Sequence, residues 1–196
     1  MDEMKLPEHM PENGAAAKKT RTEIYDWLRC IVTAIIVCVL VFIFGARIVG
    51  VVGSSMVPTL HEGDRIITSN LFYKPKQGDI VVFRKDSFDD RALVKRVIAT
   101  EGQTVDIDFE QGIVYVDGAP LKEDYVNAPT VRELDFDDEI TVPPGCVFVM
   151  GDNRNESTDS RSEALGCVDT RYLIGRGYIV FLPIRDFKLL GRPDYE

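Results

Sequence analysis

The longest apolar run of the chain lies near its N-terminus. Residues 30–46 (CIVTAIIVCVLVFIFGA) carry no charged side chain, and Trp27 and Leu28 extend the run toward its start. About 20 residues of α-helix, at about 1.5 Å each, cover the ~30 Å hydrocarbon core of a bilayer. We therefore expect residues 25–46 to form one transmembrane helix, with Tyr25 and Trp27 at the membrane interface.

The charges that flank this run predict its orientation. Four basic residues precede or begin it: Lys18, Lys19, Arg21 and Arg29. Cytoplasmic flanks are enriched in such residues, so we expect residues 1–24 to be a disordered cytoplasmic tail and residues 47–196 to be an extracytoplasmic domain. The alternatives are a cleaved signal peptide, whose apolar region is normally about 7–15 residues, and a buried core helix. The length of the run argues against the first, and its β-branched richness and lack of a polar face argue against the second.

Beyond residue 47 the pattern changes to short runs rich in Val, Ile and Phe, separated by Gly, Pro, Asp and Asn. Such runs predict β-strands. The candidates are residues 48–52, 65–69, 79–83, 93–100, 104–107, 113–116, 146–150 and 177–181. Asp117-Gly118 predicts a tight turn. The expected fold class is mainly β, on a single N-terminal transmembrane helix.

Composition narrows the classes of partner. The chain has 196 residues, a formal net charge of -9 and 45% hydrophobic residues, which suits one globular domain beside the membrane segment. Nucleic-acid binding needs a basic face, so we expect no nucleic acid as a partner. Residues 122–139 are polar and acidic and predict a surface excursion; a metal site there is the less favoured interpretation. No His or Cys cluster has zinc spacing, and we expect no metal and no cofactor.

The four cysteines fall into two groups. Cys30 and Cys38 lie in the predicted span, where they are expected to be inert apolar residues. Cys146 and Cys167 lie in the outer domain, where a disulfide is permitted. Spacing does not show whether the two meet, so their redox state stays open.

Ser55 lies about nine residues beyond the predicted span, in the run GSSMVPTL (53–60). Nine extended residues reach at most ~30 Å, so this serine is expected close to the membrane surface. The only two histidines are His9, in the tail, and His61, in a turn-like segment. No Gly-x-Ser-x-Gly motif is present, so a serine–histidine triad is disfavoured.

A serine can instead be activated by a lysine. That lysine must be neutral, and burial lowers its pKa toward the neutral form. The apolar run 93–99 (LVKRVIA) contains Lys95 and Arg96, whose side chains alternate between the two faces of a strand. Arginine does not lose its proton in proteins, so Lys95 is the candidate base. The residues alone leave open that Lys95 is an exposed strand lysine.

The run 151–161 (GDNRNESTDSR) follows an apolar strand and is almost wholly polar. Ser157 could hydrogen-bond a lysine amine and orient it. Asp159 and Arg161, two residues apart, could pair and hold the shape of the loop. Composition alone equally fits an Asx-rich surface loop.

In these segments the chain resembles the type I signal peptidases (peptidase family S26), membrane-bound Ser–Lys proteases that remove signal peptides. Four blocks occur in the order of that family: SMVPTL (55–60), GDIVVF (78–83), KRVI (95–98), and GDNR (151–154) followed by Ser157, Asp159, Ser160 and Arg161. They extend over residues 53–161, and the last block is the most specific. One span and a compact outer domain are similar to the shorter, Gram-positive-type members, so the resemblance implies their β-fold.

The resemblance also implies a role for each matching residue. Ser55 would be the nucleophile and Lys95 the general base, with Ser157 orienting Lys95. Four residues would support the loop: Asp159 and Arg161 as a structural pair near the site, and Asp152 and Arg154. The oxyanion hole would use the Ser55 backbone N–H, and position 53 as a second donor.

Three departures from the family pattern bear on this site. Some members carry a serine hydroxyl at the position of Gly53, so here that donor must be backbone, water or nothing; loss of one such donor costs ~10²–10³ in rate elsewhere. Residues 99–103 read ATEGQ where the family often has Gly-Leu-Pro-Gly-Asp, which changes the expected turn. Glu156 stands where an uncharged residue is frequent, and we expect it to face solvent.

The expected function is an endopeptidase that cleaves signal peptides from exported preproteins at the outer face of the cytoplasmic membrane, through an acyl-enzyme. Its partners would be the lipid bilayer, a nearby export translocon, and preproteins with small residues at the first and third positions before the cut, the A-x-A-like pattern. An extended substrate would pair with strand edges. Two alternatives remain: a Ser–Lys protease dedicated to another membrane-proximal precursor (pilus or conjugation), and a non-catalytic membrane-anchored binding domain.

Overall fold

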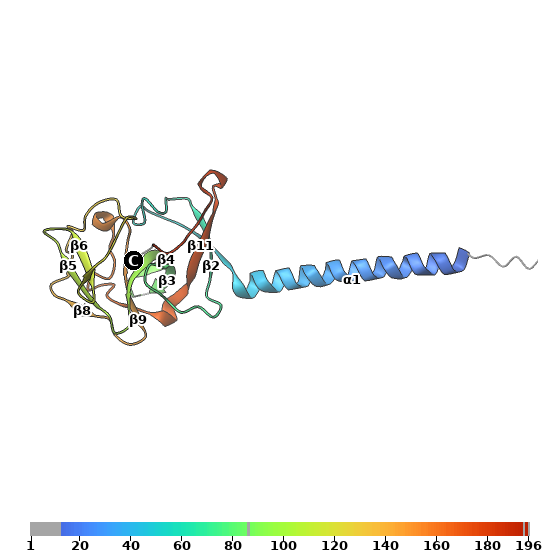
Figure 1. Cartoon of the computed structure of the whole chain (residues 1–196), viewed down its shortest axis with the longest axis horizontal. Coiled ribbons are helices and arrows are strands. Elements are labelled where there is room, and N and C mark those ends of the chain that lie inside the picture. The colour runs from blue at the N-terminus through green and yellow to red at the C-terminus, as the bar shows by residue number, and fades with distance from the viewer. Residues whose placement is uncertain (1–12, 86, 194, 196) are drawn as a thin grey trace, which may run out of the picture. The chain divides into compact units, whose positions relative to one another are not determined.

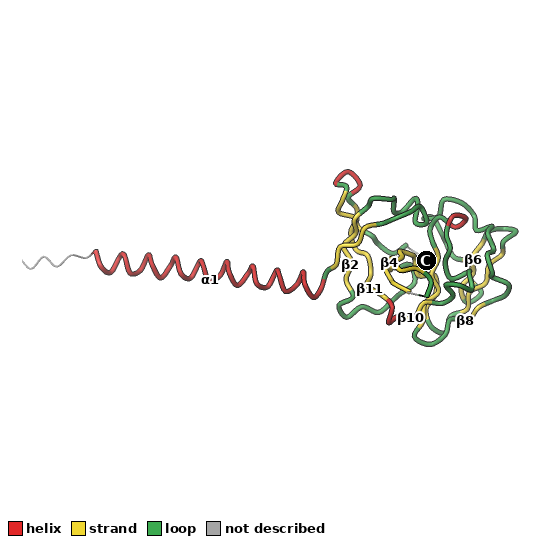
Figure 2. Tube along the Cα trace, turned by 180° about the vertical axis from the view of Figure 1, so that it is seen from behind, coloured by secondary structure: helices red, strands yellow, loops and turns green. Residues whose placement is uncertain are grey.

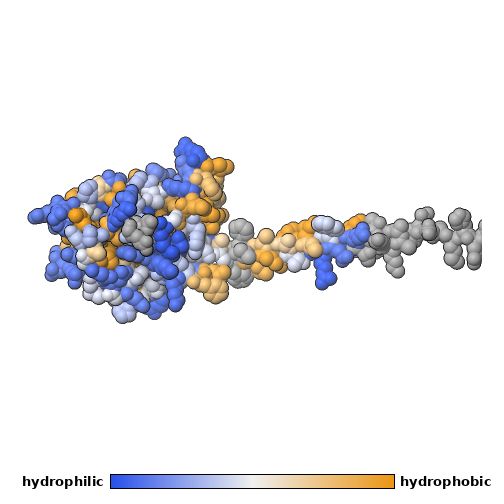
Figure 3. All heavy atoms as spheres, viewed as in Figure 1, coloured by the Kyte–Doolittle hydropathy of each residue, from blue (hydrophilic) through white to orange (hydrophobic). Residues whose placement is uncertain are grey.

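The computed structural model describes residues 13–85, 87–193 and 195 of the chain, which divides into two compact units, residues 1–43 and 44–196. The first unit contains most of one helix, α1 (Asn13–Gly45) (Figure 1). The side chains of residues 23–40 are exposed, and many of them are hydrophobic (orange in Figure 3). None of the helices in the described part of the chain combines the length and the apolar character needed to cross a membrane.

The start of α1 corrects one prediction. Residues 13–24 are helical, where a disordered tail was expected. The run AAAKK (15–19) consists of strong helix formers, and their propensity outweighs the polar composition on which the prediction rested. The rest of the predicted tail, residues 1–12, lies outside the described residues.

The second unit contains two antiparallel sheets. The larger has the order β1-β2-β11-β3-β4-β9-β10, with β12 paired to β11. Its strands are β1 (Arg47–Gly50), β2 (Arg65–Ser69), β3 (Ile80–Lys85), β4 (Asp89–Thr100), β9 (Cys146–Met150), β10 (Val168–Asp169), β11 (Leu173–Leu182) and β12 (Lys188–Leu189). The smaller has the order β7-β6-β5-β8, formed by β5 (Thr104–Asp108), β6 (Ile113–Val116), β7 (Ala119–Pro120) and β8 (Ile140–Thr141). Three short 3-10 helices complete the elements: η1 (Arg154–Glu156), η2 (Thr170–Tyr172) and η3 (Ile184–Asp186).

Within this unit the smaller sheet and the β2–β11 pair lie at opposite ends. Figure 1 and the reverse view in Figure 2 agree on this arrangement, with β4 between the two ends. The mainly β fold class is confirmed, and each of the eight predicted strands forms. The two-residue strands β7, β8, β10 and β12 were not predicted, because two residues are too few to show a period.

The central strands of the larger sheet are buried on both faces. On β3, Ile80 and Val82 pack in one cluster with Met56 and Leu60, whereas Val81 and Phe83 pack in another, with Val97 and Val149 among its other members. The first four residues of β3 are therefore all buried, which explains their uninterrupted apolar sequence. A third cluster joins the two sheets around Ile98, Val105, Val114 and Phe148.

The acidic stretch between β7 and β8 is only partly a surface excursion. Most of its residues are exposed, but Thr130 and Phe136 are buried. The Phe136 ring makes edge-on contacts with Phe109 and Phe148, at centroid distances of 6.0 and 6.1 Å. Phe136 therefore packs this acidic stretch against the core, although the composition of the stretch predicted an entirely solvent-exposed segment.

Candidate active site

Buried apolar residues hold the segment that carries Ser55. Met56 and Leu60 are 1% and 0% exposed in the cluster beneath it. Backbone hydrogen bonds run from Val57 N to Ser54 O (3.1 Å) and from Leu60 N to Met56 O (2.8 Å). The half-buried Ser55 therefore lies on an irregular segment fixed by packing on one side.

Lys95 reaches Ser55 from β4. Its Nζ lies 2.7 Å from Ser55 Oγ, and its side chain is 3% exposed. Lys95 stands directly opposite Val81 of β3, so it shares a face with that apolar residue. Nucleophile and base must be within hydrogen-bond reach, and this pair meets that criterion.

The burial of Lys95 favours its neutral form. Burial lowers the pKa of Lys95 from its ordinary value, because an ammonium group loses solvation there. The carboxylates of Asp159 and Asp152 oppose this shift, and the guanidinium of Arg161 adds to it. The net pKa is lowered, which is the direction that a lysine base requires.

The polar run that follows β9 lies directly against the Ser55 segment. Asn153 donates its backbone N–H to Ser55 O (3.0 Å) and its side-chain amide to Ser54 O (3.1 Å). Gly151 leaves no room for a side chain, because a Cβ there would overlap both Ser157 Oγ and Ser55 O. Glycine at this position thus permits the close approach of the two segments.

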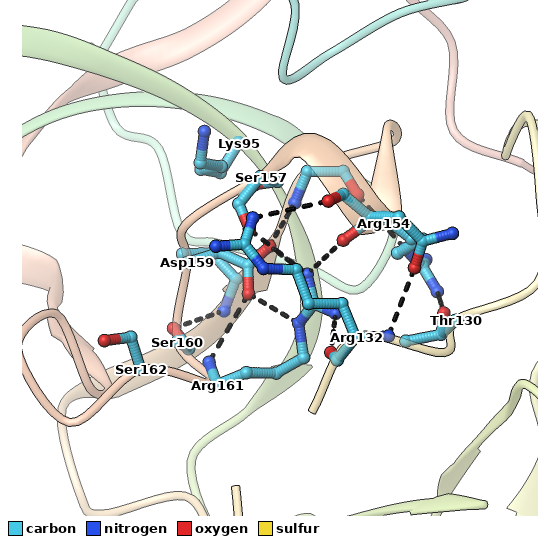
Figure 4. Close-up of polar contacts among 12 residues, drawn as sticks. Lys95, Thr130, Arg132, Arg154, Ser157, Asp159, Ser160, Arg161 and Ser162 are labelled. Carbon is cyan, nitrogen blue, oxygen red and sulfur yellow. Dashed lines mark hydrogen bonds and ion pairs between the residues drawn. The ribbon is translucent and has the colours of Figure 1, made fainter. Parts of the chain in front are cut away.

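Asp159 and Arg161 form the pair that their spacing predicted. Both side chains are 0% exposed, and Arg161 donates from Nε to Asp159 Oδ1 (2.8 Å) and from Nη2 to Oδ2 (3.0 Å). Arg161 also donates to the carbonyl oxygens of Arg132 (2.7 Å) and Arg154 (2.6 Å). Figure 4 shows Asp159 and Arg161 side by side in this loop. Asp159 Oδ2 also accepts from Gly151 N (3.0 Å), so the pair holds the loop at the point that contacts Ser55.

Arg154 supports the same loop from its other side. Its buried guanidinium donates to Gly151 O (3.1 Å), Thr130 Oγ1 (2.9 Å) and both carboxylate oxygens of Glu123 (2.7 Å to Oε2). The Tyr125 ring lies 5.9 Å from this guanidinium. Residues of the acidic stretch therefore complete the loop, a role that their composition did not predict.

Asp152 forms an ion pair with Arg96, a residue for which the sequence predicted no role. Arg96 donates from Nε to Asp152 Oδ1 (2.8 Å) and from Nη2 to Oδ2 (2.6 Å), and both side chains are buried. Alternation along a strand does not show which face is buried, and residues 94–99 of β4 are buried on both faces. A cation within an apolar run was the sequence signal that could have identified Arg96.

Ser157 and Gly53 make no contact with the Ser55–Lys95 pair through hydrogen bonds. Ser157 Oγ is buried and has no hydrogen-bond partner in the described part of the chain. Gly53 is exposed with φ of 84°, a conformation that disfavours any side chain, and apart from its two neighbours in the chain no described residue comes within 4 Å of where its Cβ would be. Glu156 is exposed, as expected.

The described cysteines and acidic residues form no candidate metal site. Cys146 and Cys167 are free thiols that pack beside the cluster between the sheets. Burial raises the pKa of Cys167 to about 11, with the neighbouring Cys146 as a smaller cause. Among residues 13–85, 87–193 and 195, no group of three or more His, Cys, Asp or Glu residues is placed to hold a metal ion.

Comparison with known proteins gives consistent matches. The family model "Signal peptidase, peptidase S26" matches residues 24–182. "Probable signal peptidase I-1" from Synechocystis sp. is 37% identical over 171 residues, 82% of this chain and 84% of that one. "Signal peptidase I" from Bacillus amyloliquefaciens is 32% identical over 194 residues, 92% and 97% of the two chains. The crystal structure of a signal peptidase I from Enterococcus faecalis V583 is 30% identical, with a TM-score of 0.45 over 53% of this chain and 97% of that chain. Since the family match covers most of its length, the chain belongs to the signal peptidase family, peptidase S26.

Proposed function

We propose that this protein is a serine endopeptidase that removes signal peptides from exported preproteins, with Ser55 as the nucleophile and Lys95 as the general base. The observation that carries the proposal is the 2.7 Å approach of Lys95 Nζ to Ser55 Oγ, inside a site where Lys95 is 3% exposed. Membership of the signal peptidase family supports the choice of substrate.

The chemistry follows from the protonation state of Lys95. The neutral amine accepts the proton of the Ser55 hydroxyl as Oγ attacks the scissile carbonyl carbon. The resulting ammonium then gives a proton to the leaving amine as the peptide bond breaks, which leaves an acyl-enzyme. Water then loses a proton to Lys95 as it attacks the ester carbonyl, and Lys95 passes that proton to Ser55 Oγ as the acyl C–O bond breaks, which releases the carboxylic acid product and restores the Ser55 hydroxyl and the neutral Lys95 amine.

Ser157 is proposed to orient Lys95. Its hydroxyl is buried beside Gly151 and has no partner among the described residues, and an unpaired buried hydroxyl is costly. The ammonium that forms on Lys95 brings additional N–H donors, which a hydroxyl acceptor nearby would stabilise. This role predicts that Ser157→Ala lowers kcat more than it raises KM.

For the oxyanion hole we propose the Ser55 backbone N–H, which donates no hydrogen bond within the described residues. The positive φ of Gly53 argues against a side-chain donor at that position, because a serine there would be strained. The Asp159–Arg161 pair, with Asp152 and Arg154, is proposed to hold the loop that positions these groups.

We also propose that residues 25–46 cross the membrane once, with residues 47–196 on the extracytoplasmic side. The uncharged run 30–46, the exposed apolar side chains of residues 23–40 and the preceding basic residues support this topology. Substrates with A-x-A-like cleavage sites, the lipid bilayer and a nearby export translocon would then be its partners.

Cleavage of one model preprotein by the full-length protein in detergent micelles tests the proposal. We expect wild type to cut after a small residue, as N-terminal sequencing of the product would show. Ser55→Ala should give no product, and Lys95→Ala and Lys95→Arg should lose about 10²–10⁴-fold in rate, because neither supplies a neutral amine. Arg171→Met, a change in an exposed ion pair, is the matched control and should cleave at the wild-type rate.

Three results would count against this function. Processing by Ser55→Ala would exclude Ser55 as the nucleophile, and substantial processing by Lys95→Arg would exclude Lys95 as the base. Failure of wild type on every secretory preprotein in a panel, with cleavage of a pilus-type precursor, would favour the dedicated protease. Failure on all of them would favour a binding domain.

A further inference from the structure

Arg96 is a buried cation that donates hydrogen bonds to both a carboxylate and a backbone carbonyl oxygen. It is 2% exposed, and it binds Asp152 through two parallel hydrogen bonds of 2.8 and 2.6 Å. Its Nη1 donates to Gly78 O (3.0 Å), and the Tyr125 ring lies 4.0 Å from the guanidinium carbon. Such a fork is a geometry that lysine cannot reproduce.

Asp152, the partner of Arg96, lies in the loop after β9 and also contacts the segment that carries Ser55. Asp152 is 0% exposed, and of its neighbours in the chain, Asn153 donates its backbone N–H to Ser55 O and Gly151 lies so close that a Cβ there would overlap this oxygen. Asp152 also accepts a hydrogen bond from Thr59, which follows Ser55 on the same irregular segment. Arg96 itself is adjacent to Lys95 on β4. The Arg96–Asp152 pair therefore links the strand of the base, the segment of the nucleophile and the loop between them.

One hydroxyl and three charged groups act on the Lys95 amine. Ser55 faces it from the segment before β2, and Asp152, Asp159 and Arg161 act on it from the loop after β9. The strands beside β4 contribute apolar residues: Val81 of β3 lies opposite Lys95, and Val149 of β9 lies opposite Val97. Both carboxylates in this set are paired with an arginine, Asp159 with Arg161 and Asp152 with Arg96. Each pair is neutral as a whole, although each carboxylate alone would stabilise an ammonium at Lys95.

We propose that Arg96 is a positioning residue that fixes Lys95 against Ser55 and, by neutralising Asp152, keeps the Lys95 amine unprotonated and available as a base. The proposal rests on the proposed function of Lys95. The Arg96–Asp152 pair would then act on the protonation of Lys95, an electrostatic effect that experiments can distinguish from a purely structural one.

The test is the pH dependence of kcat/KM for the model preprotein, measured on the full-length protein in detergent micelles. Arg96→Met leaves the Asp152 carboxylate unopposed, so the acidic limb of the profile should move to higher pH by about one unit. Asp152→Asn leaves the guanidinium unopposed, so the same limb should move to lower pH. The double variant, Arg96→Met with Asp152→Asn, removes both charges and should return the limb close to its wild-type position.

A structural role alone predicts a different pattern. Looser packing would lower kcat/KM and admit water near Lys95, which would move the limb in the same direction in both single variants or leave it in place. Either result would overturn the proposal. Arg96→Lys keeps the charge and loses the fork, so we expect a lower kcat with the limb close to its wild-type position. Arg171→Met, which alters an exposed Asp–Arg pair, should leave the limb unchanged.

Two further measurements separate the possible failures. Thermal unfolding of each variant reports whether it folds; if Arg96→Met does not, the nearly isosteric Asp152→Asn still has to move the limb to lower pH. Active Lys95→Ala would defeat the proposed function itself. Inactive Lys95→Ala, with an unmoved limb in Asp152→Asn, would defeat only the role of Arg96.

Discussion

Asp159–Arg161 and Asp169–Arg171 are two ion pairs with the same residues at the same spacing. In each, the arginine donates hydrogen bonds to the aspartate from Nε and Nη2. In the first pair, Arg161 Nε lies 2.8 Å from Asp159 Oδ1 and Nη2 lies 3.0 Å from Oδ2. In the second pair, Nε and Nη2 lie 3.0 and 2.6 Å from Asp169 Oδ2. Both side chains of the first pair are 0% exposed, whereas those of Asp169 and Arg171 are 23% and 87% exposed. Ion pairs that use the same donor atoms at the same spacing thus occur in two very different environments.

What differs is the set of groups that depend on each pair. Arg161 also binds the carbonyl oxygens of Arg132 and Arg154, and Asp159 accepts the N–H of Gly151, which lies against Ser55. Besides its own aspartate, Arg171 has no hydrogen-bond partner in the described residues. A buried charge that loses its partner has no water to replace it, whereas an exposed one has.

The largest effect is therefore expected from Arg161→Met. The change leaves the Asp159 carboxylate buried without its cation and two carbonyl oxygens without a donor. We expect a loss of about 3–5 kcal/mol in the free energy of unfolding, as for other broken buried pairs. Urea unfolding of the full-length protein measures it, with Arg171→Met as the matched control. Equal midpoints for the two variants would contradict the comparison.

A smaller loss is expected from Glu123→Gln. Arg154 is 0% exposed, and Glu123 is 9% exposed at the edge of the acidic stretch. Glutamine keeps one of the two acceptors and Thr130 keeps its bond to Arg154, so the charge assistance and one of the two hydrogen bonds to residue 123 are lost. We expect about 1–3 kcal/mol, the usual worth of a hydrogen bond to a charged group. Glu133→Gln, on an exposed part of the same stretch, is the control. A control loss as large as that of Glu123→Gln would show that the stretch as a whole, rather than the Arg154 pair, sets the effect.

These pairs also explain what could be predicted from the sequence. The strands were predictable because runs such as 65–69 and 146–150 carry their pattern locally. The Ser55–Lys95 approach joins residues 40 positions apart. No period predicts it; the chemistry of a lysine in an apolar run suggested Lys95 as the base, and the resemblance to a family assigned the two roles. Glu123 lies 31 residues from Arg154, and nothing local distinguishes it from its acidic neighbours. The pairing of Arg96 with Asp152 was not predictable, because alternation does not show that both faces of β4 are buried at this point.

The smallest effect is expected at the exposed pair. Hydrogen bonds from the side chain and backbone N–H of Arg171 lower the pKa of Asp169 to about 2, below the value of about 3.9 in an unfolded chain. Because the folded pKa is the lower one, the pair stabilises the fold above about pH 4, and this contribution is lost as pH falls through about 2. Arg171→Met should therefore leave the urea midpoint at neutral pH nearly unchanged, since exposed pairs contribute little. Its stability should also fall less steeply than that of wild type between about pH 4 and 2. A drop at neutral pH as large as that of Arg161→Met would mean that burial is not what separates the two pairs.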